Sequence, residues 1–112
     1  MRVLLDNGTP RGVTAALVGH TVEEARARGW DTFKNGELLT AAEAAGFEVF
    51  VTTDRNLRHQ QNLAERKIAI VVIGKARWKL IQPRLAEIAA AVATATPGSI
   101  IEIDIPDIYG RF

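Results

Sequence analysis

The stretch IAIVVIG at residues 68–74 limits the fold of this chain more than any other segment. It is apolar without interruption and rich in β-branched residues, which is typical of a strand covered on both faces. Strands of this kind belong to parallel sheets that carry helices on both sides. The stretch therefore predicts an α/β fold.

Strand and helix patterns alternate along the rest of the chain. Apolar runs bounded by turn residues or acids predict further strands at 2–5, 20–22, 47–54 and 99–106, the last a half-exposed edge strand. Helical patterns lie at 10–19, in a short segment ending at Gly29, at 37–46, and at 79–95, while 55–67 reads as a loop leading to a helix. This order predicts a single domain over residues 1–112, a three-layer α/β sandwich whose mostly parallel sheet has four or five strands.

Composition excludes several kinds of site. The chain has no cysteine, which rules out disulfides, thiol nucleophiles and thiolate metal sites, and its two histidines are too few for an all-histidine zinc site. No apolar run approaches the ~20 residues that span a bilayer. The opening residues MRVLLD carry no signal-peptide pattern. We therefore expect a cytoplasmic protein without a membrane partner.

Three acids occupy positions where sites form in such folds. Asp6 follows the first predicted strand, Asp54 follows the central one, and Glu37 lies in the first turn of a helix. Ligands of open parallel sheets bind beyond the carboxyl ends of the strands. Each acid also has a structural interpretation: Asp6 can cap a turn, Asp54 can cap a following helix, and Glu37 is favoured by the helix dipole.

Clustered carboxylates repel one another unless a cation shares them. Mg²⁺ or Mn²⁺ takes oxygen ligands and leaves positions for water and substrate phosphate, so the sequence predicts Asp6, Glu37 and Asp54 as metal ligands and catalytic residues. Neutral oxygen ligands or donors lie nearby in sequence, at Asn7, Asn35, Asn56 and Gln60.

Positive charge is concentrated in one stretch. Residues 55–84 hold eight basic residues and one acid, whereas residues 1–54 hold five basic residues and eight acids. A basic stretch beside an acidic one suits an anionic polymer held next to a carboxylate site, although a solvated helix face gives the same pattern. The candidates for holding such a polymer are Arg55, Arg58 and Lys75.

Two blocks of the chain resemble PIN-like domains of a bacterial family of unknown function. LLDNGTP resembles the opening LLD-E-N-x-P of that family, and residues 29–73 resemble its second block, which contains V-T-x-D-x-[DN]-[FL]. The resemblance implies a PIN-like Rossmann-type fold related to metal-dependent ribonucleases, many of which are toxins paired with a small antitoxin protein. By position, Asp6, Glu37 and Asp54 match the acidic motif residues.

The chain departs from the family pattern at two positions. Asn7 stands where many relatives have Glu, and Asn56 stands where nucleases often have Asp. Two functions therefore follow: a Mg²⁺- or Mn²⁺-dependent endoribonuclease, and a catalytically degenerate module that binds protein or RNA. A phospho-receiver is disfavoured, because Asp6 lacks a paired acid and the last strand is not followed by lysine. The alternation of Ile101, Ile103 and Ile105 suggests a homodimer through the edge strand.

Overall fold

The computed structural model describes residues 1–57 and 65–105. Within these ranges five strands form one sheet in the order β2-β1-β3-β4-β5, and every pairing is parallel. The strands are β1 (Arg2–Leu5), β2 (Thr21–Glu24), β3 (Val49–Thr52), β4 (Ala69–Ile73) and β5 (Ile100–Ile103). The predicted α/β class with a parallel sheet is confirmed.

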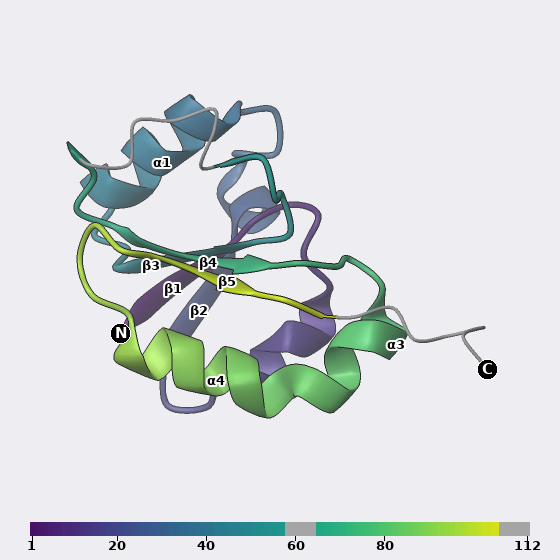
Figure 1. The fold of residues 1–112 in the computed structure, drawn as a ribbon. Coiled ribbons are helices and arrows are strands. Elements are labelled where there is room, and N and C mark those ends of the chain that lie inside the picture. The colour runs from purple at the N-terminus through teal and green to yellow at the C-terminus, as the bar shows by residue number, and fades with distance from the viewer. Residues whose placement is uncertain (58–64, 106–112) are drawn as a thin grey trace.

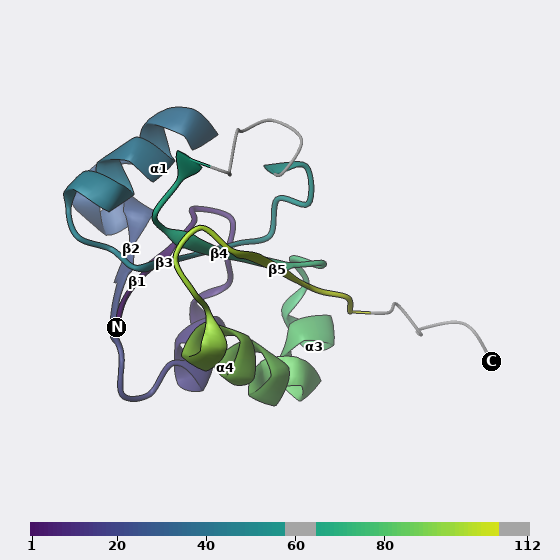
Figure 2. The same cartoon turned by 60° about the vertical axis from the view of Figure 1, so that its left-hand side comes forward.

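Helices cover both faces of the sheet, as Figures 1 and 2 show. One face carries the 3₁₀-helix η2 (Ala25–Arg28) and the helix α1 (Asn35–Ala44). The other face carries η1 (Arg11–Ala16), α3 (Trp78–Ile81), η4 (Gln82–Arg84) and α4 (Leu85–Thr94). The fold therefore has three layers, with an apolar core on each side of the sheet.

Strand side chains alternate between the two cores, because successive residues of a strand point to opposite faces. In β4, Val71 and Ile73 pack beneath the sheet against α4, while Ile70 and Val72 pack above it on the α1 side. All five residues of β4 are buried. This double burial explains why the run at 68–74 has no polar position.

Two predicted helices differ from those observed. The pattern at 10–19 forms only the short η1. There the Thr14 hydroxyl donates to the carbonyl oxygen of Arg11 at 2.9 Å, and such side-chain bonds to the backbone compete with a longer helix. The pattern at 79–95 is divided into α3, η4 and α4. Pro83 lies in η4, and it has no N–H with which to continue the helical ladder.

Gly12 allows η1 to pack directly against α3. A Cβ atom added at this position would overlap the indole ring of Trp78. The aromatic side chain therefore occupies the space that any other residue at position 12 would need.

The strand β5 lies at one edge of the sheet, as predicted. The isoleucines of β5 and of the residues just after it, however, pack in the core of their own chain. Ile103 and Ile105 are buried beneath the sheet, and Ile101 packs against the same core. The alternation that suggested a homodimer is therefore explained within one chain. Among the described residues, no helix has the length and apolar character needed to cross a membrane.

Candidate functional site

The sheet has one point where the strand order reverses. The chain passes from β1 to β2 on one side and then returns past β1 to β3 on the other. In doubly wound sheets, ligands bind at such a point, beyond the carboxyl ends of the two diverging strands. Asp6 directly follows β1, and Asp54 lies two residues after the end of β3. Both aspartates therefore lie at the reversal point.

Asp6 is half-buried, and both its backbone N–H and its carbonyl oxygen form hydrogen bonds. Its N–H donates to the carbonyl oxygen of Val51 at 2.9 Å, which continues the β1–β3 ladder, and its carbonyl oxygen accepts from Thr9 N at 3.0 Å. Its side-chain Oδ1 accepts from Asn7 N at 2.8 Å. The residue therefore caps the turn after β1 and also presents a carboxylate at the sheet edge.

Thr52, the last residue of β3, connects the two aspartates. Its fully buried hydroxyl donates to Asp6 Oδ2 at 2.6 Å and accepts from the backbone N–H of Asp54 at 3.0 Å. Sequence reasoning did not single out Thr52. The available signal was a polar residue at the end of an otherwise apolar strand, in the run VFVTTD.

Asp54 begins a tight turn. Its Oδ1 accepts from Asn56 N at 3.0 Å, and its carbonyl oxygen accepts from Leu57 N at 3.3 Å. Leu57 is fully buried in the core above the sheet, which anchors the turn. Asp54 therefore caps this turn, much as the helix-cap interpretation expects of its carboxylate. Its side chain is half-buried and lies at the reversal point.

Asn7 carries an unsatisfied polar atom. Its side-chain Oδ1 is buried and accepts no hydrogen bond, and it is the only buried side-chain nitrogen or oxygen in the described ranges that lacks a partner. Native proteins rarely leave such an atom unpaired, and a buried amide oxygen of this kind can accept from a water or bind a cation. Asn7 is adjacent to Asp6, so this amide oxygen belongs to the same turn.

The donor set at the reversal point has the chemistry that suits a hard divalent cation. Two carboxylates and one amide supply oxygen ligands, which Mg²⁺ and Mn²⁺ prefer. Mg²⁺ is commonly held by one or two carboxylates, with water and substrate phosphate completing its coordination. Asp6, Asp54 and Asn7 are therefore the residues that would hold the ion.

Glu37 does not join Asp6 and Asp54 in a three-acid group. In the part of the chain that the structure describes, no three His, Cys, Asp or Glu side chains lie together in a way that could hold a metal ion. The exposed Glu37 Oε1 instead accepts from Lys34 N at 3.1 Å, at the start of α1. This contact agrees with the helix-start interpretation of Glu37.

The other predicted binding residues are distributed around the same edge or lie elsewhere. Arg55 and Asn56 are exposed beside Asp54, and Lys75 is half-buried just after β4. Asn35 is the first residue of α1, and the structure does not describe its side chain. Arg58 and Gln60 lie outside the described residues.

The basic stretch at 55–84 does not form one surface. Arg55, Lys75 and Arg77 follow the carboxyl ends of β3 and β4, on the side of the aspartates. Arg66 instead precedes β4, at the opposite edge of the sheet, where it forms an ion pair with Glu43 at 2.9 Å. Arg84 pairs with Glu87 at 2.6 Å. Part of the charge asymmetry therefore serves the fold.

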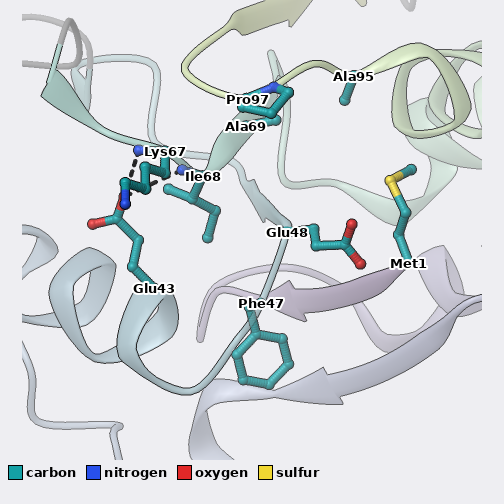
Figure 3. Close-up of a pocket in the computed structure, with 9 residues that line it drawn as sticks. All are labelled: Met1, Glu43, Phe47, Glu48, Lys67, Ile68, Ala69, Ala95 and Pro97. Carbon is teal, nitrogen blue, oxygen red and sulfur yellow. Dashed lines mark hydrogen bonds between the residues drawn. The ribbon is translucent and has the colours of Figure 1, made fainter.

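A separate cavity of about 270 Å³ lies at the opposite, amino edge of the sheet (Figure 3). Its floor is mainly apolar and includes Phe47, Ile68 and Pro97. At its side, Glu43 Oε2 accepts from the N–H groups of Lys67 at 2.6 Å and Ile68 at 3.2 Å. The contacts of Glu43 attach the start of β4 to α1.

The pKa of Glu43 is lowered by these contacts. Burial raises it, but the side-chain hydrogen bond from Arg66, the two backbone N–H groups and the charge of Arg66 together outweigh burial. Glu43 is therefore held as a carboxylate that stabilises the fold.

No family model matches the chain, and comparison with curated proteins and with solved structures finds no match.

Proposed function

We propose that this chain is a PIN-like, Mg²⁺- or Mn²⁺-dependent endoribonuclease that hydrolyses the phosphodiester backbone of RNA. One observation carries the proposal: at the point where the sheet order reverses, the buried Thr52 hydroxyl bonds both to the carboxylate of Asp6, which follows β1, and to the backbone N–H of Asp54, which follows β3. The proposal is supported further by the unpaired amide oxygen of Asn7 in the adjoining turn.

Each residue has a distinct role in this proposal. Asp6 and Asp54 hold the divalent ion, with Asn7 Oδ1 as a third oxygen ligand. When bound, the ion polarises a phosphoryl oxygen and promotes attack by water. Thr52 fixes the Asp6 carboxylate through its short hydrogen bond. Arg55 and Lys75 bind neighbouring phosphates of the RNA.

This set of roles differs from the three-acid expectation. Glu37 is assigned to the start of α1, because its carboxylate contacts Lys34 N and joins no metal-binding group of the described residues. A site with two carboxylates retains its ion weakly, so substrate phosphate is expected to complete the coordination. Binding of metal and of RNA should therefore be mutually favourable.

The experiment is an RNA cleavage assay with the purified chain. Single-stranded RNA is incubated with Mn²⁺, and wild type is compared with Asp6→Asn, Asp54→Asn and Glu37→Gln. We expect the two aspartate variants to lose cleavage and the wild type to lose it in EDTA. Glu37→Gln should retain cleavage. Equal cleavage by wild type and Asp54→Asn would identify the activity as contamination and refute the proposal.

The resemblance to PIN-like toxins extends the proposal to a partner. On this view a small antitoxin protein, encoded beside the chain, binds it and suppresses cleavage. Co-expression of the two proteins should yield a complex with reduced activity in the same RNA assay. An active protein that forms no complex with such a neighbour would remove the toxin assignment and leave the nuclease assignment intact.

A catalytically degenerate RNA- or protein-binding module is the second candidate. The observation in its favour is the absence of a three-acid group among the described residues, together with amides at positions 7 and 56. Calorimetry separates the two candidates. Specific Mn²⁺ binding that is abolished by Asp54→Ala favours the enzyme, and its absence favours the binding module.

A further inference from the structure

A notch of about 200 Å³ opens next to the reversal point, between the ends of β4 and β5. It is lined by Arg55, Val72, Gly74, Glu102, Ile103 and Asp104. Arg55 directly follows Asp54, so the notch adjoins the candidate metal site along the carboxyl edge of the sheet. Its volume accommodates one planar ring system and not a folded chain.

The backbone at the end of β4 shapes one wall of the notch. Gly74 N donates to the carbonyl oxygen of Ile103 at 2.9 Å, which keeps the chain after β4 close to β5. A Cβ atom at position 74 would approach that oxygen to 3.0 Å. Glycine therefore allows this close approach and leaves the wall without a side chain.

The lining combines apolar contact with polar groups of two kinds. Val72 and Ile103 are buried and offer apolar atoms. Glu102 and Asp104 are exposed, and they share one face of β5 and its continuation because they are two residues apart. Arg55 supplies a planar cation. The exposed lining of the notch is slightly more polar than apolar, so a ligand held there would combine hydrogen bonds with apolar contact.

We propose that this notch binds a guanine base of the RNA substrate, next to the phosphate that is cleaved. The inference rests on the proposed ribonuclease function. A carboxylate only accepts hydrogen bonds. Guanine presents N1–H and N2–H₂ side by side on its Watson–Crick edge, whereas each of the other bases places an acceptor beside its donor. The two oxygens of Asp104 can therefore pair with guanine without an unfavourable acceptor–acceptor contact.

Arg55 has a complementary role in this arrangement. A guanidinium can stack on a base or bind a phosphate oxygen. Because Arg55 connects the notch to Asp54 in the chain, it is placed to bind the phosphate that joins the guanosine to its neighbour. Single-stranded RNA is the suitable substrate, since its bases can be turned out into pockets.

The test compares binding and cleavage of two short single-stranded RNAs that differ at one nucleotide, guanosine or inosine. Inosine lacks the N2 amino group and keeps N1–H. Binding is measured in EDTA by fluorescence anisotropy, and cleavage is measured with Mn²⁺. We expect about tenfold tighter binding of the guanosine RNA by wild type, in line with the discrimination that a bidentate contact provides.

Asp104→Asn replaces one acceptor with a donor and should abolish this preference. Asp31→Asn makes the same chemical change at an exposed position outside the notch, and it should leave the preference unchanged. Equal binding of the two RNAs by wild type, or an undiminished preference in Asp104→Asn, would overturn the proposal. A preference that Asp104→Asn abolishes, without cleavage of either RNA in Mn²⁺, would support the notch and refute the nuclease function.

Discussion

The Thr52 hydroxyl donates a 2.6 Å hydrogen bond to Asp6 Oδ2, although the two residues are 46 positions apart in the chain. Thr52 Oγ1 also accepts a hydrogen bond from the backbone N–H of Asp54 at 3.0 Å. One buried hydroxyl therefore fixes the carboxylate at the end of β1 and the backbone that follows β3. The geometry of the candidate site depends on this group.

Thr52→Val should lower both stability and metal affinity. Valine keeps the shape of threonine but leaves Asp6 Oδ2 without a donor and Asp54 N without an acceptor, which typically costs about 1–3 kcal/mol. Urea denaturation measures the stability, and calorimetry measures Mn²⁺ affinity. Thr52→Ser keeps the hydroxyl and should retain most of the Mn²⁺ affinity. Equal affinities in the serine and valine variants would contradict the positioning role.

Mn²⁺ should raise the melting temperature of the wild type. A ligand that binds only the folded state stabilises it by about 2.7 kcal/mol at a concentration 100 times its dissociation constant. The shift should disappear in Asp6→Asn and in Asp54→Asn. It should persist in Glu37→Gln, where glutamine can still accept from Lys34 N. Loss of the shift in Glu37→Gln would instead indicate that Glu37 is a third acidic ligand of the ion.

Glu43→Gln should destabilise the fold in a pH-dependent manner. The pKa of Glu43 is lowered in the folded state, so its stabilisation is present above the unfolded-state pKa and is lost as pH falls through the folded-state pKa. We expect the variant to be less stable by about 1–2 kcal/mol at pH 7. The difference from wild type, followed by thermal unfolding, should narrow in acid. A difference that stays constant down to pH 2 would assign it to packing alone.

Gly12→Ala should destabilise the chain through a steric clash. The new methyl group would overlap the Trp78 indole, and overpacking of this kind costs about 1–3 kcal/mol. Gly8→Ala is the matched control, because a Cβ at position 8 would meet only Thr53 Oγ1, at an ordinary 3.6 Å. Chemical denaturation of both variants checks the prediction. Equal stabilities would show that Trp78 moves aside without penalty.

Some features of this protein could be predicted from local stretches of the sequence. A continuous apolar run such as 68–74 predicts a strand covered on both faces whatever surrounds it, since only the chemistry of its own side chains is involved. Likewise, an acid that ends such a run marks the carboxyl end of the strand. For this reason Asp6 and Asp54 could be selected without coordinates.

The remaining features depend on which strands become neighbours. Local sequence does not mark Thr52 as the partner of Asp6, because that contact requires β1 beside β3. Arg55 and Arg66 belong to one basic stretch in the sequence, yet Arg55 follows the carboxyl end of β3 and Arg66 precedes the amino end of β4. Because β3 and β4 are parallel, the two residues lie at opposite ends of the strands. Local patterns contain no information on such pairings.

The parallel α/β fold and the strand ends followed by Asp6 and Asp54 could be predicted from local sequence, because burial on both faces imposes an apolar composition on a strand. Three other features emerge only in the folded chain: among the described residues, Glu37 forms no three-acid group with Asp6 and Asp54, Thr52 links the two aspartates, and the isoleucines of β5 are covered within one chain. Each of these outcomes depends on the strand order β2-β1-β3-β4-β5, which is selected by packing between segments far apart in the chain.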